Sequence, residues 1–194
     1  MEKNEKLLKP EESLKIINDM ISSAKANFSD DSFYFLFWGW LVAIANIGEF
    51  VITNFTNYPK PYLIWLFVFP GIIVSTIYGY RKSKKEKIVS YIDKIHTWVW
   101  ISFIISYFII LFFGSKLNYN IPQLVFILIA SATFLSGLII KFKPLILGGI
   151  LFWFGSILLF IVPEFYVPLL SSAFVIIGFL IPGYMLKSYV KKNA

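Results

Sequence analysis

Six long runs of apolar residues constrain this chain more than any other feature of its sequence. Each run holds about 20 residues, enough for a helix to cross the roughly 30 Å hydrocarbon core of a bilayer. The runs cover residues 33–53, 62–80, 97–113, 121–140, 145–162 and 166–186. Backbone polar groups in hydrocarbon must be bonded within their own segment, and the runs lack the alternating polarity of barrel strands. We therefore expect an all-α, polytopic membrane protein with six transmembrane helices.

The connections between the runs are short and contain helix breakers. The prolines in or beside these connections are Pro59, Pro61, Pro144 and Pro163. Short connections join antiparallel neighbours, so the sequence predicts three helical hairpins. We expect a bundle at residues 33–187, preceded by a cytoplasmic arm at 1–32 and followed by a cytoplasmic tail at 188–194.

Positive charge is concentrated on one side of this predicted bundle. Of the 18 Lys and Arg residues, all but Lys60 and Lys116 fall in segments that share a side with both termini. The positive-inside rule places that side, and hence both termini, in the cytoplasm. The net charge of +7 therefore reflects membrane topology and does not indicate binding to nucleic acid.

The sequence also indicates a cellular location. The first 30 residues are highly charged and contain no apolar signal-peptide core, so the first run is expected to act as the insertion signal. The absence of cysteine excludes disulfides, thiolate metal sites and cysteine nucleophiles. The bias toward Ile, Lys, Phe and Asn is typical of an AT-rich bacterial genome, and we predict a multi-pass protein of the bacterial cytoplasmic (inner) membrane.

The segment before the first run has the pattern of an amphipathic helix that begins at Pro10. Apolar residues recur there at intervals of three and four: Leu14, Ile17, Ile21, Ala24 and Phe28. This stripe could contact lipid headgroups, a partner protein, a second copy of the chain or the bundle's own helix ends. Residues 1–32 hold five Lys and seven Asp or Glu, whereas helices on anionic lipid usually have a basic polar face. A protein surface is therefore favoured over a lipid surface.

A basic cluster follows the second run. Five cations fall within seven residues: Arg81, Lys82, Lys84, Lys85 and Lys87. The cluster is expected to set topology and to contact anionic lipid, with about 1 kcal/mol of attraction for each cation. His96 comes next, and we expect it to be a solvated side chain near the headgroups.

Two segments of the chain indicate an internal repeat. Trp38 and Trp153 each follow Leu-Phe, and each is followed eleven residues later by Glu-Phe, at Glu49 and Glu164. Both copies start on the same side, so the repeat is parallel about the membrane normal. Glu49 and Glu164, with Asn46 one turn inward, either line an outer vestibule for a cation or proton, or anchor helix ends at the interface. Pro70 is the candidate hinge, because proline removes a helical hydrogen bond.

Short motifs occur at residues 10–17, residues 32–35 with Trp38-Gly39-Trp40, residues 78–82, residues 141–145 with Gly148-Gly149, and Pro182-Gly183-Tyr184. Through these motifs the chain resembles a family of uncharacterised six-span inner-membrane proteins of Bacteroidota-type bacteria. The resemblance covers nearly the whole chain. It supports the six-span topology and implies no activity.

The chain shows no nucleophile–base pair, metal-ligand cluster or phosphate-binding glycine loop. We therefore expect it not to be an enzyme and to carry no cofactor or metal. The favoured function is an accessory, sensor or regulatory module in the bilayer that docks a cytoplasmic or membrane protein through its N-terminal helix. The alternative is a small transporter or channel, as a single copy or as a homo-oligomer, that uses the outer carboxylates and the Pro70 hinge.

Overall fold

The computed structural model describes residues 32–85 and 91–193. Within these ranges the chain is helical, without strands, and six helical stretches are long and apolar enough to cross a membrane. These spans are Ser32–Phe55, Pro61–Lys82, Asp93–Phe112, Ile121–Ile140, Lys143–Ile161 and Glu164–Tyr189. The predicted all-helical architecture with six spans is therefore confirmed. The predicted arm helix and Lys87 lie outside the described residues.

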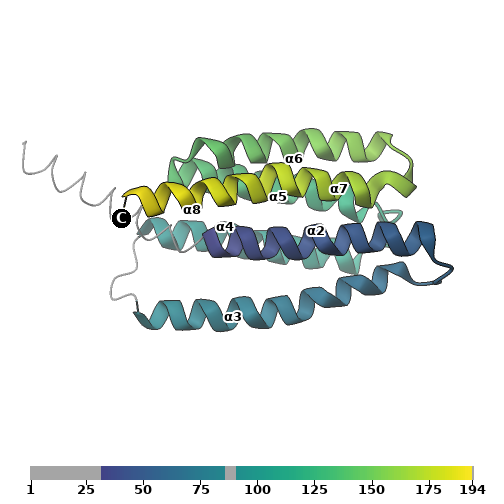
Figure 1. Cartoon of the computed structure of the whole chain (residues 1–194), viewed down its shortest axis with the longest axis horizontal. Helices are drawn as coiled ribbons and strands as arrows, with labels where there is room; N and C mark the ends of the chain where they lie inside the picture. The colour runs from purple at the N-terminus through teal and green to yellow at the C-terminus, as the bar shows by residue number, and fades with distance from the viewer. Residues whose placement is uncertain (1–31, 86–90, 194) are drawn as a thin grey trace, which may run out of the picture.

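Four of the spans are single α-helices (Figure 1). They are α2 (Ser32–Phe55), α4 (Tyr91–Phe112), α5 (Ile121–Ile140) and α6 (Lys143–Ile161). The α4 helix begins six residues before the predicted start at residue 97. Proline at the first or second position of α5 and α6 suits a helix start, because no intrahelical N–H bond is lost there.

The second span changes its helical type along its length. It consists of a 3₁₀ helix, η1 (Pro61–Phe67), followed by α3 (Val68–Lys85). Pro70 lies two residues after the change and has no N–H to bond the carbonyl of Leu66, four residues earlier. An unbroken α-helical ladder therefore cannot run across this point.

The last span is also composite. After the 3₁₀ turn η2 (Glu164–Tyr166), it runs through α7 (Val167–Val175), the π-helical segment η3 (Ile176–Leu180) and α8 (Ile181–Asn193). The segment from residue 188, predicted as a tail, continues α8 as helix. A π-helical turn is often found at a functional or tightly packed position. Here it carries Gly178, which lies against Gly148 of α6.

The packed core involves four of the six spans. In the apolar 18-residue stretch of α2, α5, α6 and the last span, 28 to 50% of the residues are buried, against 6% in the same stretch of the second and third spans. Aromatic rings pack edge to face in this core. The ring centroids of Phe152 and Phe179 are 6.1 Å apart, and those of Phe35 and Phe179 are 5.1 Å apart. Figure 1 accordingly shows α3 at the edge of the bundle.

The most extensive contact between two helices is that of α5 with α6, the fourth and fifth spans. The three predicted hairpins instead paired spans one with two, three with four, and five with six. Glycines allow α5 and α6 to approach closely. A Cβ atom on Gly149 would lie 2.7 Å from the backbone nitrogen of Phe134, and one on Gly137 would lie 2.6 Å from that of Ile146. Small residues drive such packing in membranes, where the hydrophobic effect between helices is absent.

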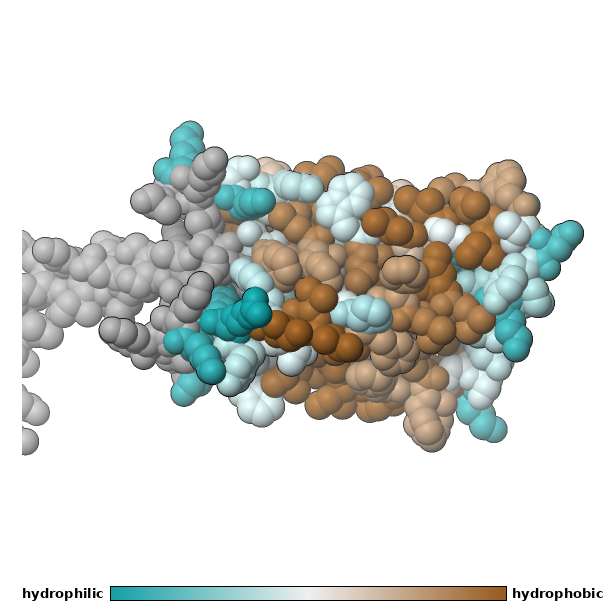
Figure 2. Space-filling model, turned by 60° about the horizontal axis from the view of Figure 1, so that its bottom comes forward, coloured by the Kyte–Doolittle hydropathy of each residue, from teal (hydrophilic) through white to brown (hydrophobic). Residues whose placement is uncertain are grey.

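The surface has a broad apolar band between two polar ends (Figure 2). One end of the bundle contains the start of α2 and the end of α3, where the rings of Phe33 and Tyr78 stack. It also contains the start of α4 and the end of α5, where His96 contacts Ser136. The α5–α6 turn lies beside α8 at the same end. We call this the basic end. It holds the cations Arg81, Lys82, Lys84, Lys94, Lys141, Lys143, Lys187 and Lys192. The other end, called here the opposite end, contains Glu164 and Lys60.

Candidate functional site

Glu49 joins the first span to the second. Its Oε2 accepts a hydrogen bond of 2.8 Å from Nε1 of Trp65, in η1, and the carboxylate is half-buried. The sequence predicted Glu49 either as a vestibule residue or as an interfacial anchor, and did not identify its partner. The bond links α2 to η1, because the indole N–H can only donate and the carboxylate accepts.

The other two predicted outer residues lie close to Glu49 in depth but have separate surroundings. Asn46 is 5% exposed, and its Nδ2 donates to the carbonyl of Val42 in its own helix over 2.9 Å. Glu164 is exposed at the start of η2. The rings of Phe50 and Phe165, the residues that follow the two glutamates, are 5.7 Å apart, so both glutamates lie at the opposite end. Among the described residues no hydrogen bond joins any two of Asn46, Glu49 and Glu164.

His96 is not the solvated residue that the sequence predicted. It is 9% exposed, its Nε2 lies 3.0 Å from Oγ of Ser136 in α5, and Nε1 of Trp100 donates to the same Nε2 over 3.1 Å. An indole nitrogen can only donate, so Nε2 accepts and the proton of the neutral ring belongs on Nδ1. The helical spacing of four between His96 and Trp100 is the sequence signal that could have predicted this contact.

Gln123 is a buried polar residue that sequence reasoning missed. It is 6% exposed in α5, and its Nε2 donates to the carbonyl of Leu159 in α6 over 3.1 Å. In return, Oγ of Ser156 in α6 donates to the backbone carbonyl of Gln123 over 2.9 Å. This reciprocal pair links α5 and α6 near the opposite end. A glutamine two residues into an apolar run was the available signal, because a buried amide needs partners.

Buried polar groups form a layer in the half of the core nearer the opposite end. Gly39 of α2 packs on Leu180, and Gly155 of α6 packs on Phe174. Both α2 and α6 run antiparallel to the last span. Counting along the helices from these two contacts therefore places Asn46 and Ser156 at about the same depth as Ser172. The layer consists of the neutral amides and hydroxyls of Asn46, Gln123, Ser156, Ser171 and Ser172. Of these groups, Gln123 and Ser156 form hydrogen bonds between α5 and α6, and Asn46 bonds within its own helix. None of them is an acid or a base at neutral pH.

The remaining predicted positions lie on the surface. Pro70, in the second span, is exposed. In the basic cluster, Arg81 and Lys84 are exposed and Lys82 is half-buried, and Nζ of Lys84 lies 4.6 Å from the ring centroid of Tyr80. The backbone of Lys85 ends α3. In residues 32–85 and 91–193, no group of three or more His, Asp or Glu side chains could hold a metal ion.

Comparison with models of protein families, with curated proteins and with solved structures found no match to this chain. The family resemblance in the sequence therefore stays a prediction. The geometry of the chain's own residues carries the functional argument that follows.

Proposed function

We propose that this protein is a non-catalytic membrane module that docks a partner protein through its N-terminal segment, residues 10–28. The composition of the described core carries the proposal. Apart from His96, its buried polar side chains are amides and hydroxyls, and the amides of Asn46 and Gln123 and the hydroxyl of Ser156 bond to helix carbonyls. Charged side chains lie toward the two ends. A core built in this way supports a scaffold role, with recognition placed outside the bilayer.

The N-terminal stripe offers the recognition surface. Leu14, Ile17, Ile21 and Phe28 recur on one predicted face, the pattern with which an amphipathic helix fills an apolar groove. The arm joins the bundle at Ser32, which is 6% exposed at the start of α2. A bound partner would thus be held close to the basic end. Because the arm has more acidic than basic residues, we propose a groove with cations at its rim.

We also propose that the basic end faces the cytoplasm of a bacterial cell, in accordance with the positive-inside rule. The natural absence of cysteine allows a direct test. A cysteine at Thr56, exposed at the opposite end, should react with a membrane-impermeant maleimide on intact cells, whereas one at Lys192 should react only after lysis. The reverse labelling pattern would contradict this orientation.

Site-specific photo-crosslinking in the native cell tests the docking function. A photoreactive amino acid at Ile17 lies in the stripe, and one at Asp19 lies about 200° around the predicted helix and serves as the matched control. We expect one discrete protein adduct from position 17 that is absent from position 19. The adduct should be lost when Leu14 and Ile21 are changed to Ser. Crosslinks only within the chain itself, or only to lipid, would contradict the proposal.

The transporter or channel alternative has less support from the geometry. It needs outer carboxylates that are free to attract a cation, and Glu49 already accepts a hydrogen bond from Trp65. Ion flux into proteoliposomes should be compared for the unmodified chain and for Glu49→Gln with Glu164→Gln. Flux that is lost in these variants would favour the transporter over the docking module.

A further inference from the structure

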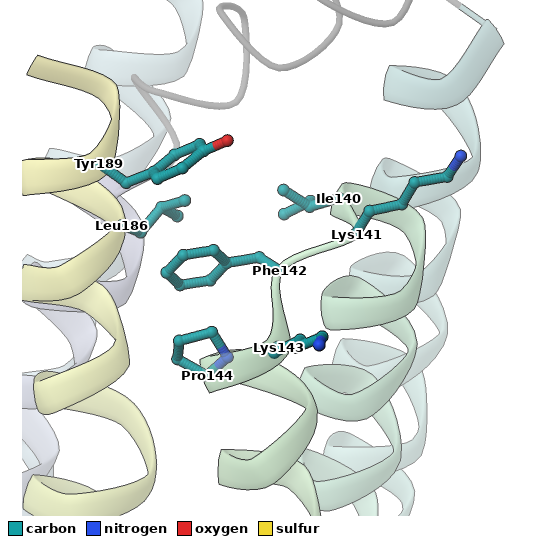
Figure 3. Close-up of a pocket in the computed structure, with 7 residues that line it drawn as sticks. All are labelled: Ile140, Lys141, Phe142, Lys143, Pro144, Leu186 and Tyr189. Carbon is teal, nitrogen blue, oxygen red and sulfur yellow. The ribbon is translucent and has the colours of Figure 1, made fainter. Parts of the chain in front are cut away.

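A cavity of about 270 Å³ lies at the basic end, between the α5–α6 turn and α8. Figure 3 shows Ile140, Phe142, Pro144 and Leu186 around the space, with the ring of Tyr189 beside them. The centroids of the Phe142 and Tyr189 rings are 5.9 Å apart. The walls are therefore mostly aliphatic and aromatic, which suits a hydrocarbon ligand.

The α5–α6 turn adopts a conformation that disfavours the residue it contains. Lys141 has φ of 56°, in the left-handed region. Its N–H donates to the carbonyl of Leu138 over 3.2 Å, and the N–H of Phe142 donates to that of Gly137 over 2.9 Å, the pattern of a Schellman motif. Glycine is the usual residue at this position, because a Cβ atom meets steric resistance there. Backbone geometry therefore does not account for a lysine.

Two cations form the rim of the cavity. Lys141 and Lys143 are both exposed, and Figure 3 shows their side chains pointing to the side away from Leu186 and Tyr189. An apolar space thus lies next to two ammonium groups on long, flexible stems. The two lysines follow the last turn of α5 and begin α6, at the depth where a transmembrane helix meets the headgroup layer.

We propose that this cavity binds an anionic phospholipid of the surrounding bilayer. Its apolar space takes a segment of an acyl chain or the glycerol region, while Lys141 and Lys143 hold the phosphate. The volume supports a partial fit, because it falls just below the roughly 300 to 1,000 Å³ of sites that enclose a whole small molecule. The rest of the lipid stays in the bilayer. Basic pockets between helices at the cytoplasmic surface bind such headgroups. The site is separate from the basic cluster at residues 81–87 and from the arm.

Native mass spectrometry of the full chain tests the site, with phosphatidylglycerol and phosphatidylethanolamine offered in equal amounts. We expect preferential retention of phosphatidylglycerol. Lys141→Gly and Lys143→Gln should each reduce its affinity by about fivefold, the equivalent of about 1 kcal/mol for each cation. Lys94→Gln with Lys192→Gln removes two exposed charges from the same end but none from the cavity or from the basic cluster, and should leave the retained lipid nearly unchanged.

Thermal unfolding of the same variants separates a binding defect from a folding defect. Lys141→Gly relieves the left-handed conformation, so its unfolding temperature should stay level or rise while its lipid affinity falls. Three results would overturn the proposal. The first is an equal loss of lipid affinity in the two cavity variants and in the control variant. The others are no preference between the two lipids, and displacement of the lipid by excess inorganic phosphate. The last result would indicate a site for free phosphate. The proposal does not depend on the arm, so failure of the crosslinking test would leave it standing.

Discussion

At the scale of single residues, glycines allow the helices to approach closely, and the atoms next to each glycine decide whether a larger side chain would fit there. A Cβ atom on Gly149 would press on the backbone of Phe134, at 2.7 Å from its nitrogen. One on Gly71 would instead lie 2.5 Å from Cδ1 of Leu41, the end of a flexible side chain. Backbone cannot move without separating α5 from α6, whereas a leucine can change its rotamer.

We therefore predict different outcomes for two alanine substitutions. Gly149→Ala should destabilise the protein by about 1 to 3 kcal/mol relative to Gly71→Ala, the usual range for overpacking. Both positions are helical, so the gain in helix propensity is the same in the two variants. Unfolding in detergent, followed by circular dichroism during an SDS titration, measures the difference. Equal stabilities would show that α5 and α6 are not in close contact.

A second residue-scale prediction concerns two serines with different hydrogen bonds. Ser156 donates from α6 to the carbonyl of Gln123 in α5, whereas Ser131 donates to the carbonyl of Ile127 in its own helix. Ser156→Ala should destabilise by about 0.6 to 1.7 kcal/mol, the measured range for hydrogen bonds between membrane helices. Ser131→Ala should change stability by only a few tenths of a kcal/mol, because its carbonyl partner stays bonded within the helix. The same SDS titration applies. A larger effect at Ser131 would contradict the assignment.

At the scale of elements, the second span is held mainly at its two ends. Near the opposite end, Trp65 of η1 donates to Glu49. Near the basic end, the rings of Phe33 and Tyr78 stack with centroids 4.0 Å apart. Few of its residues are buried between these points. The Glu49–Trp65 hydrogen bond therefore has a larger share in positioning this span than a single bond has in the core.

This arrangement predicts that Glu49→Ala loosens η1. Spin labels on cysteines at Val51 and Tyr62, both exposed, report the separation of α2 and η1 by double electron–electron resonance. The distance distribution should broaden in Glu49→Ala and stay narrow in Glu49→Gln, whose amide oxygen still accepts from Trp65. A control pair at Ile127 and Ile157 on α5 and α6 should not change. An unchanged distribution in Glu49→Ala would show that the bond does not hold η1.

At the scale of the whole molecule, the bundle divides into a packed core of four spans and two peripheral spans. In the apolar 18-residue stretch of each span, 28 to 50% of the residues are buried in the core spans and 6% in the peripheral spans. Stability in a membrane comes from packing and hydrogen bonds between helices. The peripheral spans should therefore separate from the core before the core itself unfolds.

Cysteine labelling tests this order of unfolding. Ser75→Cys reports on α3 and Ser171→Cys reports on the core, and both serine hydroxyls are buried without a hydrogen-bond partner. We predict that a thiol reagent reaches position 75 at a lower SDS fraction than position 171. The two changes are equally small, which makes each a control for the other. Simultaneous labelling would indicate a single cooperative unit of six spans.

The amino-acid sequence by itself determined the number of spans, their approximate limits and the concentration of cations toward one end. The physical reason is that hydrocarbon as a solvent requires long, apolar, internally bonded segments, and length with hydropathy can be read directly from a chain. It also indicated Glu49 and Asn46 as polar residues of the first span. These properties belong to single segments and do not depend on their neighbours.

Only the tertiary structure decided which spans form the core and which partners the polar residues find. Residues that face lipid and residues that face a helix are both apolar. The first span, in the core, and the second span, at its edge, have the same mean hydropathy, so composition does not distinguish them. The contacts of Trp65 with Glu49, of His96 with Ser136 and of Gln123 with Leu159 depend on how each helix is rotated. Rotation is set by close packing at glycines such as Gly149, between segments whose register no local pattern specifies.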